Sequence, residues 1–277
     1  MGGPETAEGG NLTAEYDPLV APPPKEVPLR NAPLVRVIAQ VRFSPILSVQ
    51  QPEFIAPFQE AIRAAYPVLH QEHAQSLLVG PQGIATGQKQ VAWRLADVEG
   101  AWRVSLAPEF VALETTDYSS RNDFIGRMQV VLGAVAKHIE PAVVQRVGLR
   151  YIDRVTGDAL EDIAKLVRPE MLGIVNTPLY EHARHELSET LLSVPDTGEQ
   201  LLARWGHLPA GGTVDPNAIE PIQERSWVLD IDMFSAEQQP FAADSLIEDL
   251  SRFAKRLYTV FRWTVTEEFL LRYGGEP

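Results

Sequence analysis

The amino-acid sequence predicts an α+β fold with a mostly antiparallel sheet, made of two related halves that each run β-α-β-β-β-α. Segments in which apolar and polar residues alternate indicate half-buried strands, and segments with helical periodicity lie between them. The aromatic strand that begins at Trp102 has a counterpart that begins at Trp227. The helices after these two strands match in their apolar residues at a constant offset of 122 positions, with Phe124, Ile125, Met128, Val131, Leu132, Val135 and Ile139 corresponding to Leu246, Ile247, Leu250, Phe253, Ala254, Leu257 and Phe261. We therefore expect a duplicated, pseudo-symmetric sheet with helices on one face.

The first half begins with the run LVRVIAQVRF, in which Val35, Val37 and Val41 alternate with other residues and indicate a strand with one buried face. Pro57 is tolerated only in the first turn of a helix, so the next helix begins close to Glu53 or Phe54. The expected elements are a strand at 34–43, a helix at 54–66, strands at 90–97, 102–107 and 110–115, and a helix that starts from a capping box at Ser120 and runs to His138.

The second half repeats this order with longer connections. A turn at Asp196-Thr197-Gly198 joins two of its strands into a hairpin. The expected elements are a strand at 143–155, a helix at 158–167 capped by Asp158, strands at 186–194 and 200–208, a loop rich in Gly and Pro at 209–221, a strand at 227–234, a helix at 244–261 and a short apolar tail at 269–273.

The chain organisation follows from these patterns. Residues 1–30 are rich in Gly, Glu and Pro and are expected to form a disordered or extended acidic tail. Residues 31–140 form the first half and residues 141–277 the second. The link at Glu140-Pro141 is too short for independent motion, so the halves are expected to form one pseudo-duplicated domain.

Composition narrows the classes of function. The chain has 277 residues, 45% of them hydrophobic and 22% charged, which is ordinary for a soluble globular protein. It contains no cysteine, which excludes disulfides, thiolate catalysis and cysteine-based metal sites. No apolar run approaches the roughly 20 residues that span a bilayer, and the acidic N-terminus is not a secretory signal, so a cytoplasmic protein without membrane contact is expected. The net charge of −13 argues against binding to nucleic acid.

The densest polar cluster lies in the strand expected at 143–155. Alternation places Arg146, Arg150 and Arg154 on one face of this strand, with Tyr151 and Asp153 on the other. Three guanidiniums spaced four residues apart on one strand face repel one another unless an anion neutralises them. They can form a binding stripe for a phosphate, a carboxylate or an acidic partner, or they can pair with acids of a neighbouring strand. The candidate ligand-binding residues are Arg146, Arg150, Tyr151, Asp153, Arg154, Asp230 and Asp232.

Other motifs do not point to a catalytic residue, a cofactor or a metal. His182, His185, Glu186 and Glu189 would share one face of a helix, but the strand expected from Glu186 onward separates them. No segment has the spacing of a phosphate-binding loop, and Gly-x-Ser-x-Gly is absent. The sequence therefore predicts no catalytic set, no cofactor and no metal site.

The chain also carries four motifs that occur together in one group of proteins: AQVRFSP at 39–45, Tyr118 followed by Phe124, VGLRYIDR at 147–154 and FRWTVT at 261–266. On these motifs the chain resembles an uncharacterised, sporadically distributed bacterial family whose members are about this size. Asp153 stands where that family often has Asn. The resemblance spans roughly residues 30–270 and implies an accessory role in a defence, toxin-control or mobile-element system, without implying an activity.

Two hypotheses follow. The first is a cytoplasmic, non-enzymatic binding and assembly protein that holds a protein partner or a second copy of itself through its sheet, with the acidic tail as a possible contact. The second is an enzyme that binds a small molecule or nucleotide on Arg146, Arg150 and Arg154. A nucleic-acid binder is the least favoured class because of the overall charge.

Overall fold

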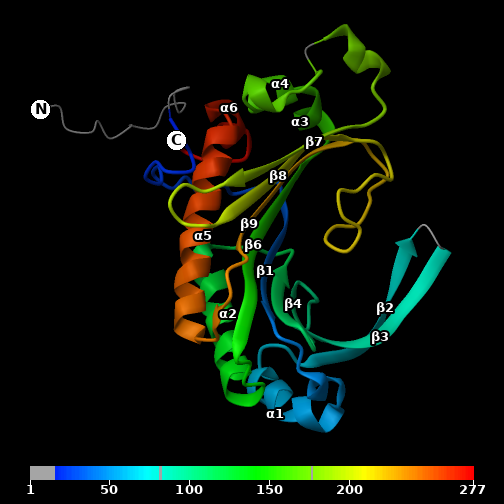
Figure 1. Cartoon of the computed structure of the whole chain (residues 1–277). Helices are drawn as coiled ribbons and strands as arrows, with labels where there is room; N and C mark the ends of the chain where they lie inside the picture. The colour runs from blue at the N-terminus through cyan, green and yellow to red at the C-terminus, as the bar shows by residue number, and fades with distance from the viewer. Residues whose placement is uncertain (1–15, 81–82, 176) are drawn as a thin grey trace, which may run out of the picture. The chain divides into compact units, whose positions relative to one another are not determined.

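The computed structural model describes residues 16–80, 83–175 and 177–277, without the side chains of residues 73–90. It confirms the predicted α+β class, with a mostly antiparallel sheet and helices (Figure 1). The chain divides into two compact units. The first unit contains the chain up to Arg36, Arg150–Met233 and Arg252–Pro277, and the second contains Val37–Leu149 and Phe234–Ser251. The boundary expected between residues 140 and 141 therefore lies inside the second unit.

The second unit has the strand order β2-β3-β4-β5-β1-β6, with the short β10 paired to the start of β6. The pairs β2–β3, β3–β4, β4–β5 and β5–β1 are all antiparallel. Its elements, some of which continue into the first unit, are β1 (Leu34–Phe43), α1 (Pro52–Ile62), β2 (Val68–Gly80), β3 (Gly83–Ala96), β4 (Trp102–Ala107), β5 (Phe110–Thr115), α2 (Arg121–His138), β6 (Val143–Val155), β10 (Gln239–Pro240) and the start of α5 (Ala243–Thr264), with a 3-10 turn η1 (Leu47–Gln50).

Local sequence explains most of these elements. The alternation predicted for β1 is present, because Val37, Val41 and Phe43 are fully buried. The predicted cap of α2 is also present, since the hydroxyl of Ser120 accepts a hydrogen bond from the backbone N–H of Asp123. The ring of Phe124 on α2 lies 5.8 Å from the ring of Trp102 on β4, so this helix packs on its sheet through predicted core residues.

The hairpin β2–β3 was missed in part. No strand was expected before residue 90 in this region, yet β2 begins at Val68 and β3 begins at Gly83. Figure 1 shows the pair as a long two-stranded ribbon, and β3 pairs with β4 only over Trp93–Ala96. These two strands are held together by hydrogen bonds between their backbones. Such pairing does not require alternation of apolar and polar residues, which is the signal that predicts a strand from the sequence.

The first unit has the strand order β6-β9-β8-β7. Strands β7 and β8 pair antiparallel from Glu186 opposite His207 to Ser193 opposite Gln200, around the predicted turn (Figure 1). Its elements, besides those shared with the second unit, are α3 (Gly157–Glu161), α4 (Ile163–Leu166), β7 (Glu186–Ser193), β8 (Gln200–Leu208), β9 (Ser226–Ser235), the end of α5, α6 (Glu267–Arg272) and two 3-10 turns, η2 (Pro169–Met171) and η3 (Pro178–His182).

Two predicted elements of this unit differ. The helix expected at 158–167 is broken into α3 and α4 at Asp162, and its N-cap is Thr156, not Asp158. The apolar tail expected at 269–273 is instead the helix α6, whose first turn is capped because the Thr266 hydroxyl accepts a hydrogen bond from the backbone N–H of Phe269.

The N-terminal segment, expected to be disordered or extended, makes specific contacts over the residues that the structure describes. Residues 16–30 follow the C-terminal part of α5. Arg256 donates hydrogen bonds to the carbonyls of Pro18 and Ala21, and the Tyr258 hydroxyl accepts one from the backbone N–H of Val27. Because Val27 is buried, this segment adds apolar contact to the unit. The part of the expected tail before Tyr16 lies outside the described residues.

The helices in the described part of the chain include none long and apolar enough to cross a membrane.

The pairing of β7 with β8 requires a glycine at position 206, which gives a first prediction. Gly206 has φ 144°, and a side-chain Cβ there would collide with the carbonyl oxygen of Glu186. We expect Gly206→Ala to lower the free energy of unfolding by about 1–3 kcal/mol, measured by urea denaturation. The matched control is Gly126→Ala on the exposed side of α2, where nothing lies within 4 Å and the change should raise stability by up to about 1 kcal/mol. Equal effects of the two substitutions would contradict the prediction.

Candidate functional site

A row of alternating charges crosses the four strands of the first unit. It consists of Arg150 on β6, Asp230 on β9, Arg204 on β8 and Glu189 on β7, and we call it the charge ladder. Arg150 donates from Nε and Nη2 to the two carboxylate oxygens of Asp230, at 2.7 and 2.8 Å. Nη1 of Arg204 lies 3.5 Å from Oδ2 of Asp230, and Nε of Arg204 donates to the Glu189 carboxylate at 2.6 Å. Each charge therefore faces an opposite charge on the next strand.

The ladder is most deeply buried in its middle. The side chain of Asp230 is 2% exposed, whereas that of Glu189 is 57% exposed. Burial disfavours the charged form of Arg150, but hydrogen bonds and attraction from Asp230 and Asp215 outweigh it and raise the pKa of the guanidinium. Arg150 is therefore a permanent cation, held between carboxylates.

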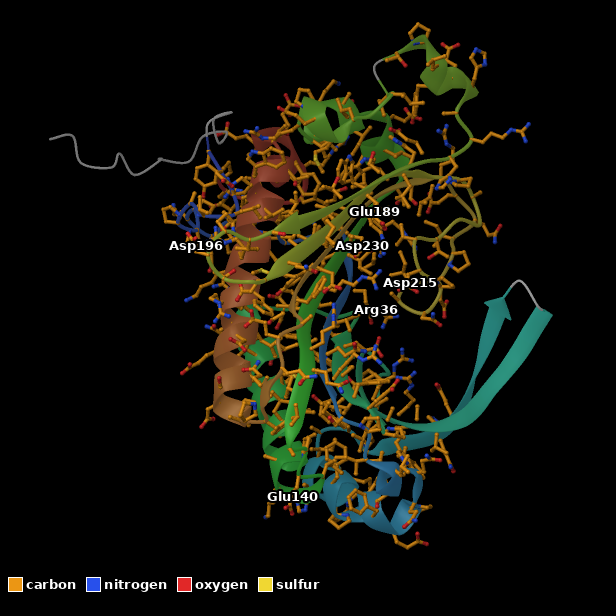
Figure 2. The ribbon with its side chains drawn as sticks, in the orientation of Figure 1. Arg36, Glu140, Glu189, Asp196, Asp215 and Asp230 are labelled. Carbon is orange, nitrogen blue, oxygen red and sulfur yellow. The ribbon has the colours of Figure 1, made fainter. Side chains whose placement is uncertain are left out.

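The Gly- and Pro-rich loop between β8 and β9 is attached to the same region by three arginines. Arg150 donates to the Asp215 carboxylate at 2.8 Å, and Arg36 and Arg154 donate to the carbonyls of Ala218 and Glu220, both at 2.9 Å. Figure 2 labels Arg36, Asp215, Asp230 and Glu189, which lie near one another in the first unit. The loop also buries Ala218 and Ile219. The arginines thus hold a segment of the chain itself.

The predicted site residues have different surroundings. Arg150 and Asp230 come together directly, which is the neutralised arrangement that the sequence left open. Arg154 donates to Glu220, and burial lowers the pKa of its guanidinium. Arg146 belongs to the second unit, where its guanidinium lies 4.4 Å from the centre of the Phe234 ring. Tyr151 and Asp232 are half-buried residues of β6 and β9.

Asp153 lies on the opposite face of β6 from Arg150 and Arg154, as alternation predicts. It is 5% exposed, and burial raises the pKa of its carboxyl to about 7. Tyr273 lies nearby, in the turn that ends α6. Burial, and to a smaller extent the charge of Asp153, raise the pKa of the Tyr273 hydroxyl. Asp153 is thus a buried acid, and an amide at this position would avoid the cost of a buried charge.

The sequence missed three members of this region. Arg204 and Glu189 face each other because β7 and β8 pair around the predicted turn, so the hairpin pattern contained a signal for them. Asp215 lies in the irregular loop, where no periodicity indicates its partner.

A second missed feature is His207 on β8, which is buried with neither ring nitrogen hydrogen-bonded to a protein group. Burial and the nearby Arg225 lower the pKa of His207 to about 4, so its imidazole is neutral near pH 7.

Metal binding has no geometric support among the described residues, since no three His, Asp or Glu side chains come together as ligands would. His182 ends the short turn η3, and Glu186 begins β7. The Glu186 carboxylate is directed at His207, at 3.7 Å from Nδ1, and its other oxygen accepts a hydrogen bond from the backbone N–H of Ile174.

The outer edge of β7 is the remaining feature of the site. In the described chain no strand pairs with this edge, because β7 is the last strand of the order in its unit. Its outward face presents Leu187 and Leu191, 36% and 56% exposed, on either side of Glu189. An unpaired strand edge exposes backbone N–H and C=O groups that can pair with another chain.

Comparison of the chain with family models and with curated proteins found no match. The resemblance to a bacterial family described above therefore stays a prediction.

The charge ladder gives a second prediction. Removing Arg150 leaves Asp230 buried beside Arg204 alone, so we expect Arg150→Ala to lower the free energy of unfolding by about 3–5 kcal/mol in urea denaturation. Arg42→Ala is the control, because its ion pair with Glu109 is far more exposed than that of Arg150 with Asp230 and contributes about 1 kcal/mol or less. A loss at position 150 no larger than at position 42 would show that the ladder does not hold the unit together.

A third prediction concerns Asp153. Its folded-state pKa lies near 7, above the unfolded value, so the folded protein binds a proton that the unfolded chain releases between about pH 4 and 7. The contribution of this group to stability is therefore largest below pH 4 and is lost as the pH rises through 7. We expect Asp153→Asn to match the wild type at pH 4 and to exceed it at pH 8 by on the order of 1–4 kcal/mol.

Urea denaturation of both proteins at several pH values between 4 and 8 tests this. If the free energies of unfolding of the two proteins differ by the same amount at every pH, the pKa of Asp153 is not raised in the folded protein and the prediction is wrong.

Proposed function

We propose that this protein is a non-enzymatic binding and assembly protein that captures an extended segment of a partner protein as an additional strand on the outer edge of β7. The observation that carries the proposal is the charge ladder, which alternates cation and anion over four strands and ends at this edge on the exposed carboxylate of Glu189. The next strand in this order would contribute a cation opposite Glu189.

The neighbours of Glu189 define the rest of the partner segment. Leu187 and Leu191 lie two residues away on the same face and are exposed. A strand paired with β7 would place its own residues opposite these leucines, where apolar side chains stabilise cross-strand pairs. The segment is therefore expected to read apolar-x-basic-x-apolar. The net charge of −13 favours approach of a basic partner.

A heterologous partner is better supported than a second copy of this chain. Two β7 strands related by a two-fold axis pair antiparallel with residues of the same face opposite each other. The two longest overlaps of this kind bring Glu189 opposite either Glu189 or Leu191. Neither residue supplies a cation, and two carboxylates directly opposite each other repel. Self-association is therefore an outcome that the test must distinguish.

Three further parts of the proposal rest on the sequence. The constant offset of 122 residues between the apolar positions of α2 and α5 supports an origin of the two halves by duplication. The resemblance to a sporadically distributed bacterial family supports an accessory role in a mobile or defence-type system. The absence of cysteine in the sequence is in keeping with a cytoplasmic location.

The alternative of an enzyme that binds an anion on Arg146, Arg150 and Arg154 has less support. Arg150 donates to two carboxylates and Arg154 donates from Nη2 to a backbone carbonyl, so both guanidiniums already have an acceptor, while the buried Nε of Arg154 has none in the described part of the chain. An anionic ligand would have to displace Asp215 and its loop.

A charge exchange tests the proposal. The probes are two blocked synthetic peptides, Ser-Val-Thr-Lys-Thr-Val-Ser and the same peptide with Glu in place of Lys. We expect the Lys peptide to bind the wild type more tightly than the Glu peptide, and Glu189→Lys to reverse this preference. Each preference should be up to about tenfold, because a cross-strand pair contributes about 0.2–1 kcal/mol and the two peptides compare an attractive pair with a repulsive one. Affinity is measured by titration calorimetry, and backbone amide protection by hydrogen exchange locates the peptide.

The matched control is Glu72→Lys. Glu72 on β2 is exposed to a similar extent and pairs with Arg94 on β3 at 3.0 Å, so the change has the same chemistry at another edge. Peptide preference unchanged by Glu189→Lys, or an equal change with Glu72→Lys, would rule out the β7 edge as the site. Dimers of the free protein that disappear in Glu189→Lys would assign the edge to self-association.

A further inference from the structure

A pocket in the first unit lies apart from the outer edge of β7. It has a volume of about 360 Å³, at the lower end of the range for small-molecule sites. Three segments form its walls: the N-terminal segment with Leu19 and Val20, the turn between β7 and β8 with Val194, and the face of α5 with Lys255. The labelled residue Asp196 marks this turn in Figure 2.

The pocket carries positive charge in an otherwise acidic protein. Arg252, Lys255 and Arg256 line it from one face of α5, and Glu199 is its only carboxylate among the described lining residues. Glu199 is buried and bonded to Arg252. The pocket lining therefore has more cations than anions, although the whole chain has a net charge of −13. An anion would therefore be attracted to this position.

The three cations have different roles. Arg252 is neutralised by Glu199, and Arg256 donates to the carbonyls of Pro18 and Ala21, which holds the N-terminal segment in place as a wall. The ammonium group of Lys255 has no bond to another side chain among the described residues. Lys255 is therefore the cation that a ligand can use without breaking an internal contact.

Apart from Thr197, the rest of the lining is apolar. Val194 and Met233 are buried, while Val20 is 54% exposed on the N-terminal wall. None of the described lining residues is aromatic, so the pocket lacks a surface on which a nucleotide base could stack. An aliphatic chain suits these walls, because it would cover Val20 and remove its side chain from water.

We propose that this pocket binds a small amphipathic carboxylate of the fatty-acid class, with the carboxylate at Lys255 and the aliphatic chain against Leu19, Val20 and Val194. The site is separate from the proposed strand-binding edge, so either can fail without the other. The N-terminal segment forms one wall, and a bound chain would hold this segment more firmly against α5.

Titration calorimetry of the full-length protein with sodium decanoate, below the concentration at which it forms micelles, tests the proposal. We expect Lys255→Glu to weaken binding by about tenfold or more, which corresponds to about 1.4 kcal/mol. The control is Lys137→Glu, an exposed lysine of α2 in the second unit, which should leave the affinity unchanged. Lys255→Gln, which removes the charge without adding one, should give an intermediate loss. Circular dichroism verifies that each variant is folded.

Two further probes separate the parts of the ligand. Decanol has the same chain without the charge and should bind at least about tenfold more weakly than decanoate. Val20→Asp should weaken decanoate binding through the loss of apolar contact. The proposal is overturned if decanoate does not bind the wild type, if decanol binds equally well, or if the two lysine variants at 255 and 137 behave alike.

Discussion

The burial of the Asp230 carboxylate among the strands of the first unit is the constraint on which that unit depends. A buried carboxylate without a cation costs several kcal/mol, so β9 can carry Asp230 at this position only if neighbouring strands supply positive charge. Arg150 supplies it from β6 through two hydrogen bonds, and Arg204 approaches from β8. A slip of one residue would turn each of these side chains to the other face of the sheet. The ladder therefore defines the register of the strands as well as neutralising their charges.

The same constraint determines the path of the loop between β8 and β9. This loop carries Asp215 to a third donor of Arg150, so the guanidinium that neutralises Asp230 also holds a segment with no regular structure. Arg36 and Arg154 then bind loop carbonyls, which buries Ala218 and Ile219 without leaving these acceptors unpaired. Arginine suits this role because its planar head offers several donors in fixed directions. Arg150 and Arg154, two of the three arginines that resemble an anion-binding stripe in the sequence, instead hold this loop of the chain itself.

Charge is unevenly distributed over this acidic protein, and the two proposed sites use opposite signs. The outer edge of β7 ends in a carboxylate between leucines, an arrangement that both discourages pairing with an identical strand and leaves room for a basic one. The pocket beside the N-terminal segment collects the cations of α5 around an apolar wall. Asp153 and His207 show a further consequence of burial, since the loss of water favours the neutral form of each: it raises the pKa of the Asp153 carboxyl to about 7 and, together with Arg225, lowers the pKa of His207 to about 4.

Local pattern in the sequence was sufficient for most elements, because their cause is local. The alternation of β1, the hydroxyl cap of Ser120 on α2 and the turn around Asp196 act within a few residues, and each is present where the pattern predicts it. Elements without such a cause were missed or misplaced. The hairpin β2–β3 forms by backbone pairing, and the helix expected at 158–167 breaks at Asp162. The sequence likewise identified Arg150 and Asp230 as candidates, and strand alternation assigned Asp153 to the face opposite Arg150. What the sequence alone determined is the class of the fold, the periodicity of its elements and the type of charge on each strand. Only the tertiary structure decided which charges meet, because Asp215, Arg204 and the unpaired edge of β7 are brought into relation with Arg150 by contacts between residues far apart in the chain.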